Sequence, residues 1–175
     1  MRESSLGPKG RSASVRSTAC SGKELEVPFN VEAERSILGS ILIVPVLLQD
    51  LIAANLRSSD FYLDANRHIY RRALDLVRSS RPVDAVSLAE ELNIHQELEL
   101  IGGYAYLSDL VDSAVPERNH VLYHAEIVMT KAKLRQIQII GERARAAAGA
   151  PRADPIKLGQ HLIDKIEAIL REATT

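Results

Sequence analysis

A long stretch without proline in the second half of the chain limits the folds open to it most strongly. Residues 117–148 lie between Pro116 and Gly149, and a helix of that length spans roughly 45 Å at 1.5 Å per residue. Apolar residues recur along one face of this helix and, in a second set, towards another face. The first set is Val121, Ala125, Val128, Ala132 and Ile139, and the second is Ile127, Leu134 and Ile137. Two apolar faces predict two packing partners.

A second helix is expected to fold back along the first. Residues 149–153 form a break that contains Gly149 and Pro151, and Asp154 followed by Pro155 is a typical helix start. The apolar stripe of this second helix is broad, and it comprises Leu158, Leu162, Ile163, Ile166, Ile169 and Leu170. Residues 117–172 are therefore predicted to form an antiparallel helical hairpin.

Residues 28–116 contain several shorter helical segments. Asn30 is placed to cap the first, in which Ile37, Leu38, Ile41 and Leu42 recur at helical spacing. Gly39 within this segment costs about 1 kcal/mol relative to alanine, which indicates a neighbour packed close to the backbone. Further helix starts are predicted at Pro45, at the caps Asp64 and Asp84, and after Gly102-Gly103. The predicted fold is all-α, a compact helical head (residues 28–116) followed by the hairpin (residues 117–172).

Residues 1–27 differ from the rest of the chain, because they are rich in serine and charge and show almost no apolar periodicity. We predict a disordered tail there. The whole chain has 22 Lys and Arg against 23 Asp and Glu, so it has no general attraction to nucleic acid or to an anionic membrane. A lone cysteine, Cys20, excludes an internal disulfide. The start lacks the apolar core of a signal peptide and no apolar run reaches membrane length, so a cytoplasmic location is expected.

The most specific motif lies at the start of the head. Residues 28–42 read Pro28-x-Asn30-x-Glu32-Ala33-Glu34-x-Ser36-Ile37-Leu38-Gly39-Ser40-Ile41-Leu42. This run resembles the opening of the N-terminal domain of DnaB-type replicative DNA helicases. Further motifs follow in the order of that family: Asp60-Phe61-Tyr62, His68-Ile69-Tyr70, Pro82-Val83-Asp84 and Gly102-Gly103-x-Ala105-Tyr106-Leu107. The resemblance extends from residue 28 to about residue 170.

The resemblance implies a role in DNA replication. In that family the head and hairpin form a collar domain that dimerises through the hairpins, builds a hexamer as a trimer of dimers, and docks primase or a helicase loader. The complete family protein contacts DNA and uses ATP and Mg²⁺ in a motor domain that follows the hairpin. A free-standing helical regulator or DNA-binding protein of the same ancestry is the alternative.

A phosphate-binding loop is not found in this chain. Such a loop needs glycines, a lysine and a Ser or Thr at fixed spacing to hold phosphates and Mg²⁺. Ser21-Gly22-Lys23 fails the pattern, because Ser17 and Glu24 stand where a glycine and a hydroxyl are needed. We therefore expect no ATPase activity and no cofactor in these residues.

Two sets of hairpin residues are the candidates for contacts with other molecules. For self-association we predict the apolar residues Leu134, Ile137, Leu158, Leu162 and Ile166. For a partner protein or DNA the candidates are the basic residues Lys131, Lys133, Arg135, Arg143 and Arg145. His120 and His124 have the spacing of two metal ligands on one helix face, but no third ligand is evident, so no metal site is expected.

Overall fold

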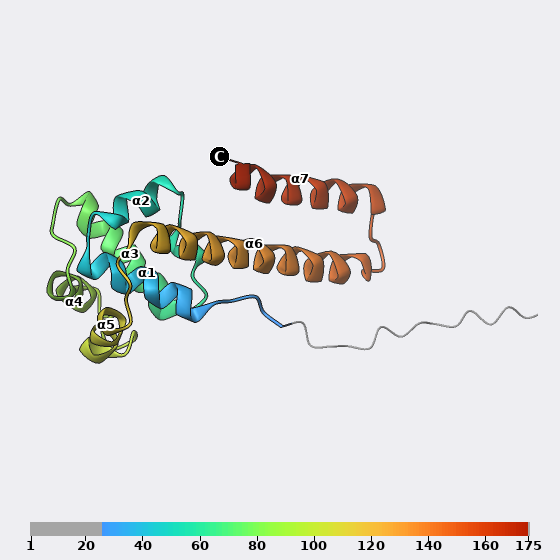
Figure 1. Ribbon diagram of the computed structural model, residues 1–175. Helices are drawn as coiled ribbons and strands as arrows, with labels where there is room; N and C mark the ends of the chain where they lie inside the picture. The colour runs from blue at the N-terminus through green and yellow to red at the C-terminus, as the bar shows by residue number, and fades with distance from the viewer. Residues whose placement is uncertain (1–25, 175) are drawn as a thin grey trace, which may run out of the picture.

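The computed structural model describes residues 26–174, and these residues form helices and connecting loops without a strand. The predicted all-α fold is confirmed. Most of the tail predicted for residues 1–27 lies outside the described residues. The elements, in order, are α1 (Val31–Ile43), α2 (Leu47–Ala53), the 3₁₀ helix η1 (Ser58–Asp60), α3 (Asp64–Arg78), α4 (Ala85–Ile94), α5 (Gly103–Asp112), α6 (Arg118–Ala148) and α7 (Pro155–Thr174). Figure 1 shows α1 to α5 gathered at one end, with α6 and α7 extending away from them.

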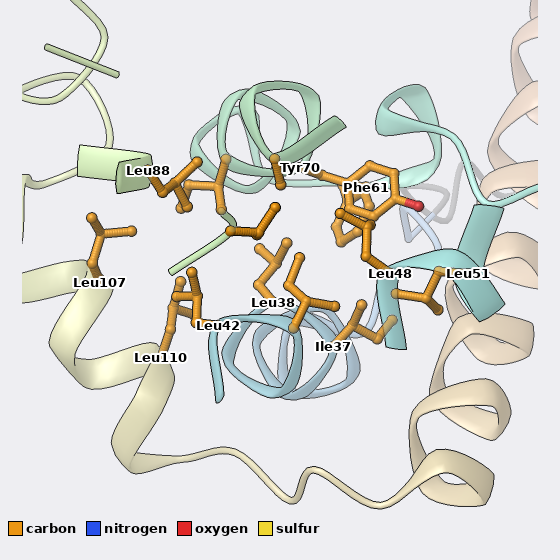
Figure 2. Packing of buried hydrophobic residues seen from close by; sticks show 14 of the residues in the cluster. Ile37, Leu38, Leu42, Leu48, Leu51, Phe61, Tyr70, Leu88, Leu107 and Leu110 are labelled. Carbon is orange, nitrogen blue, oxygen red and sulfur yellow. The ribbon is translucent and has the colours of Figure 1, made fainter. Parts of the chain in front are cut away.

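The centre of the head is α1, which contacts α2, α3, α5 and α6. Its apolar residues Ile37, Leu38 and Ile41 are fully buried. Figure 2 shows Leu38 and Leu42 directed toward leucines of neighbouring helices. The start of α1 is as predicted, because Oδ1 of Asn30 accepts a hydrogen bond from the Ala33 N–H at 3.0 Å. The sequence motif of residues 28–42 is therefore the central helix of the core.

Gly39 lies where α1 crosses α5. A Cβ built on Gly39 would fall 1.9 Å from the carbonyl oxygen of Leu110 and 2.8 Å from Cβ of Ala114. The predicted close neighbour is confirmed, and it is the backbone at the end of α5. Glycine is required here because a side chain would push the two helices apart.

The start of α3 corrects a prediction. Asp64 was expected to cap this helix, but it is the first helical residue and the preceding Leu63 makes no side-chain cap. The cap comes instead from the buried carboxylate of Glu34 on α1. It accepts hydrogen bonds from the N–H groups of Tyr62 and Leu63 and, at 2.8 Å, from Nδ2 of Asn66. A side chain 28 to 32 residues away thus accepts from one of the free N–H groups at the start of α3, that of Leu63, and also holds Tyr62 and the Asn66 side chain.

Two other helix starts were predicted with different success. Oδ1 of Asp84 accepts from the N–H groups of Val86 and Ser87 at 2.9 and 2.8 Å, which confirms this residue as the cap of α4. Pro45 was expected at the first position of the second helix, but α2 begins two residues later, at Leu47. Pro45 and Val46 instead form a turn between α1 and α2.

The helix α6 belongs to both parts of the molecule. Its residues Val121, Ala125, Val128 and Ala132 are buried, and the first three are part of the head core. The head therefore includes the first half of α6, and the boundary predicted at residue 116 divides a continuous core. Ile139 was predicted on the same buried face but is exposed, and it lines an open pocket with Arg57 of the head and Ile169 of α7.

A buried ionic cluster fixes the loop after α4 to α3. The carboxylate of Glu97 accepts hydrogen bonds from Arg72 at 2.8 and 3.0 Å and from Arg71 at 2.9 Å, and it lies 2.8 Å from Nδ1 of His68. The Arg72 guanidinium is the main reason that the pKa of Glu97 falls to about 2, and His68 lowers it further.

This pKa shift predicts a loss of stability in acid. Because the folded state lowers the pKa of Glu97 below 4.5, its stabilising effect is present above about pH 4.5 and disappears as the pH falls toward 2. We expect Glu97→Gln to lower the free energy of unfolding by about 2 kcal/mol at pH 7, with a smaller difference at pH 3. Urea unfolding at both pH values measures this. The control Glu99→Gln alters an exposed side chain, and a constant Glu97→Gln effect at both pH values would contradict the assignment.

Candidate self-association surface

The turn between α6 and α7 is built as predicted. Gly149 follows the last residue of α6, and Pro155 begins α7. Oδ1 of Asp154 accepts hydrogen bonds from the N–H groups of Ile156 and Lys157 at 3.0 and 3.2 Å, which closes the start of α7. Figure 1 shows α7 running back along the second half of α6.

Two of the predicted self-association residues lie in the groove between the two helices of the hairpin. Leu158 and Leu162 are half-buried and face α6 of the same chain. With Ile140, Ala144 and Ala147 they line a narrow groove of about 210 Å³ between the helices. Self-association through these two leucines stays a prediction, and their place in this groove shows that they also lie against α6 within the hairpin.

The other three predicted residues are exposed on the two helices of the hairpin, and together with the exposed isoleucines of α7 they are called the outer face below. Leu134, Ile137 and Ile166 are 43%, 45% and 42% exposed. Ile156 and Ile163 on α7 are 82% and 52% exposed and were not predicted as contact residues. The apolar stripe of α7 is too wide for α6 alone to cover, so some of its residues must stay exposed. This width is the sequence signal that could have identified Ile156 and Ile163.

On α6 the outer face follows a regular repeat. The residues Tyr123, Ile127, Thr130, Leu134, Ile137 and Gly141 are separated alternately by four and three positions. This is the spacing with which one helix packs along another in a coiled coil. A Cβ on Gly141 would meet no atom within 4 Å, so no part of the described chain covers the repeat there. Ile127 is partly buried against the head core, so the part of the repeat that is open to a second helix is Leu134, Ile137 and Gly141.

The predicted basic residues divide into two groups. Arg143 and Arg145 are exposed, and Lys131 and Lys133 are half-buried. Among residues 26–174 none of these four forms an ion pair. They remain candidates for contact with an acidic partner or DNA.

The fifth predicted basic residue, Arg135, is committed to the head and is removed from that set. Its guanidinium donates to the carbonyl oxygen of Pro28 at 2.8 Å and to that of Asp60, and its Cζ lies 5.7 Å from the ring centroid of Tyr62. Burial lowers its pKa. This side chain fastens α6 to the segment before α1 and to the end of η1. The partners are 75 and 107 residues away, and helical periodicity carries no sign of them.

The two histidines on α6 lie against one another. The ring centroids of His120 and His124 are 4.1 Å apart in an edge-on arrangement, and burial, with a smaller effect of His120, lowers the pKa of His124. Among residues 26–174 no three His, Cys, Asp or Glu side chains are grouped to hold a metal ion. None of the described helices is long and apolar enough to cross a membrane.

Comparisons with known sequences agree with the motifs of the head. The family described as DnaB-like helicase N terminal domain matches residues 26–130. The replicative DNA helicase DnaB of Mycobacterium leprae is 40% identical over 129 residues, 73% of this chain and 21% of the relative. DnaB of Geobacillus stearothermophilus is 35% identical over 147 residues, 84% of this chain and 31% of the relative. The chain thus spans about a fifth to a third of the length of these relatives.

Comparisons with solved structures agree with the fold. The crystal structure of the N-terminal domain of DnaB helicase from Mycobacterium tuberculosis matches with a TM-score of 0.74 and 34% identity, covering 82% of this chain and 99% of that one. A DnaB-like replicative helicase, studied with its interactions with primase, matches with a TM-score of 0.66 and 27% identity over 79% of this chain and 31% of that one. Sequence motifs, the family match and the helical fold agree, and the chain belongs to the DnaB-like helicase N-terminal domain family.

Proposed function

We propose that this chain is the assembly and docking module of a replicative DNA helicase. In this proposal two copies pair through the outer faces of their hairpins, and such dimers are the units of a hexamer. The hairpin also offers a surface to primase or a loader, and the complete protein contacts DNA and uses ATP and Mg²⁺. The single observation that carries the proposal is the uncovered apolar outer face on a fold of the DnaB-like family.

The energetics of the outer face favour pairing. Leu134, Ile137, Ile163 and Ile166 are each about half exposed, so covering each one removes roughly 80 Å² of apolar surface and stabilises the contact by about 2 kcal/mol. A symmetric pair counts every residue twice. The sum, about 16 kcal/mol before the costs of association, is comparable with the estimated 4–15 kcal/mol lost in rotational and translational freedom. The outer face is therefore sufficient for a reversible dimer.

Primase docking and helicase activity enter the proposal through the relatives. The relatives are replicative DNA helicases, and one structural relative was studied with its interactions with primase. We assign no ATP chemistry to the chain itself, and we include a cytoplasmic location in the proposal. The exposed Arg143 and Arg145 are the residues we propose for partner contact.

A charge at the centre of the outer face tests the pairing. We expect Ile137→Glu to weaken self-association by at least tenfold, because a carboxylate would be buried against a second apolar face. Sedimentation velocity at tens of micromolar measures the effect, with circular dichroism to show that the helices are retained. The matched control is Ile52→Glu, since Ile52 on α2 is 40% exposed, close to the 45% of Ile137. A monomeric wild type, or equal association of both variants, would show that the outer face is not the interface.

A further inference from the structure

One end of the head is strongly acidic. Residues 85–117 include seven carboxylates and no Lys or Arg. Two of the seven are paired within the head, Glu91 with Arg81 and Glu97 with Arg72. The other five are exposed and form no ion pair with another residue that the structure describes. These five define the acidic end: Glu90, Glu99, Asp109, Asp112 and Glu117.

An open groove with apolar walls lies beside these carboxylates, between α4 and α5. Its volume is about 470 Å³, and Val86, Tyr104 and Val111 line it together with Glu90 of the acidic end. Val86 was among the apolar positions of the predicted fourth helix, yet it is 80% exposed, and Tyr104 is 65% exposed. A surface that combines apolar side chains with unpaired carboxylates is complementary to a segment that carries cations and apolar side chains.

A segment of that composition belongs to the same chain. Residues 6–16, called the basic segment below, contain three cations and two large apolar residues. These five are Leu6, Lys9, Arg11, Val15 and Arg16. No Asp or Glu occurs from residue 4 to residue 22. Residues 1–25 have five Lys and Arg against two Glu, which leaves 17 Lys and Arg against 21 Asp and Glu in residues 26–175. The start of the chain is therefore opposite in charge to the rest.

The basic segment is long enough to reach the groove. Residue 26 is the first that the structure describes, and its carbonyl oxygen accepts a hydrogen bond from Gln138 at 3.1 Å. From there the chain covers at most about 27 Å to Gly39, which packs against the backbone of α5. Residues 16 and 6 lie 10 and 20 positions before residue 26, and an extended chain spans about 33 and 66 Å over these lengths. The tether therefore allows the contact within one chain.

We propose that the basic segment docks in the groove between α4 and α5 of its own chain. Its three cations face the acidic end, and its two apolar side chains cover those of Val86 and Tyr104. Because tethering holds the local concentration at about 1 mM, a contact with a dissociation constant of about 100 µM is about nine-tenths formed. The groove is then occupied in the free chain, and a basic segment of another protein has to displace residues 6–16. This contact goes beyond the proposed function and does not depend on self-association.

The lone cysteine provides a probe of this contact. Cys20 lies four residues after Arg16, and a nitroxide attached to it weakens the NMR signals of nearby amides. In the whole labelled chain at about 50 mM salt, we expect the amides of Tyr104 and Ser108 to lose intensity relative to the reduced label. At about 1 M salt, where the Debye length falls to about 3 Å, this loss should disappear. The amide of Gly149, at the turn of the hairpin, is the internal control.

A mixed sample shows whether the segment and the groove belong to one chain. Isotope-labelled Cys20→Ser chains, which cannot carry the nitroxide, are mixed with nitroxide-labelled chains of natural isotope composition. We expect no loss at Tyr104 and Ser108 in this mixture, because each segment is held in its own chain. Loss of these signals in the mixture would overturn docking within the chain. The absence of a salt-sensitive loss in the labelled chain itself would overturn the contact altogether.

Charge reversal identifies the side chains. Arg11→Glu with Arg16→Glu, or Glu90→Lys with Asp112→Lys, should each abolish the loss of signal at α4 and α5, because like charges then face one another. Joining the two pairs of substitutions in one chain should restore the loss, since each reversed surface meets its complement.

Two exposed carboxylates of the hairpin provide the matched control. Glu142→Lys with Asp164→Lys makes the same change in net charge as the head variant. Figure 1 places the hairpin away from α4 and α5, so this control should keep the wild-type loss of signal. Circular dichroism shows whether each variant retains its helices. A loss that survives either reversal, or one that is not restored when the two are joined, would refute pairing between the basic segment and the acidic end.

Discussion

Gly39→Ala is expected to destabilise the head by about 3 kcal/mol or more. The new Cβ would lie 1.9 Å from the carbonyl oxygen of Leu110, which belongs to the backbone of α5 and cannot rotate away. Helices α1 and α5 would have to separate, and the core between them would lose its close packing. Equilibrium urea unfolding followed by circular dichroism measures the change in the free energy of unfolding.

A second glycine provides the control for this substitution. Gly159 lies within α7, and a Cβ there would meet no atom within 4 Å. Gly159→Ala should therefore leave the head unchanged and stabilise the helix by up to about 1 kcal/mol. If Gly39→Ala unfolds at the same urea concentration as the wild type, the close crossing of α1 and α5 is wrong.

Glu34→Ala should cost about 3 kcal/mol. The substitution removes the acceptor for two backbone N–H groups at the start of α3 and for the amide of the buried Asn66. Buried donors left without an acceptor lose their hydration with no compensation. The loss extends further, because Oδ1 of Asn66 accepts from the hydroxyl of Tyr106 at 2.7 Å, so one network joins α1, α3 and α5.

Hydrogen exchange distinguishes this cap from a general effect on packing. In Glu34→Ala the amides of Tyr62 and Leu63 should exchange faster than in the wild type, and Glu34→Gln, which keeps one acceptor oxygen, should be intermediate in stability. Glu32→Ala is the control, because Glu32 is exposed in the same turn of α1. Unchanged protection of both amides in Glu34→Ala would contradict the role of Glu34 as the cap of α3.

The contrast between correct and incorrect helix starts follows from distance along the chain. Asn30, Asp84 and Asp154 each accept hydrogen bonds from N–H groups two or three residues later, so the local sequence contains both partners. The cap of α3 has its acceptor in another helix, and a local pattern favoured Asp64 in its place. Contacts of this kind depend on how the helices pack, which periodicity does not specify.

The candidate self-association surface could also be predicted only in part, because helical periodicity does not specify how the two helices of the hairpin pack. Helical spacing identified Leu134, Ile137 and Ile166 as apolar residues of the hairpin, and the structure leaves all three outward. It did not distinguish them from Leu158 and Leu162, because the rotation of α7 about its own axis depends on the turn before it. Arg135 was grouped with exposed cations for a similar reason, since its acceptors are backbone carbonyls that no residue type reveals.

The continuity of α6 makes the hairpin a lever. About half of the helix is embedded in the head and the remainder, about 24 Å at 1.5 Å per residue, projects beyond it as a stiff arm. A turn of the head by about 10° would therefore sweep the tip of the arm through about 4 Å, with no joint at which the movement could be absorbed. Arg135 fastens the arm where it leaves the head. A small rotation of the head would therefore become a larger displacement of any molecule bound at the tip of the hairpin.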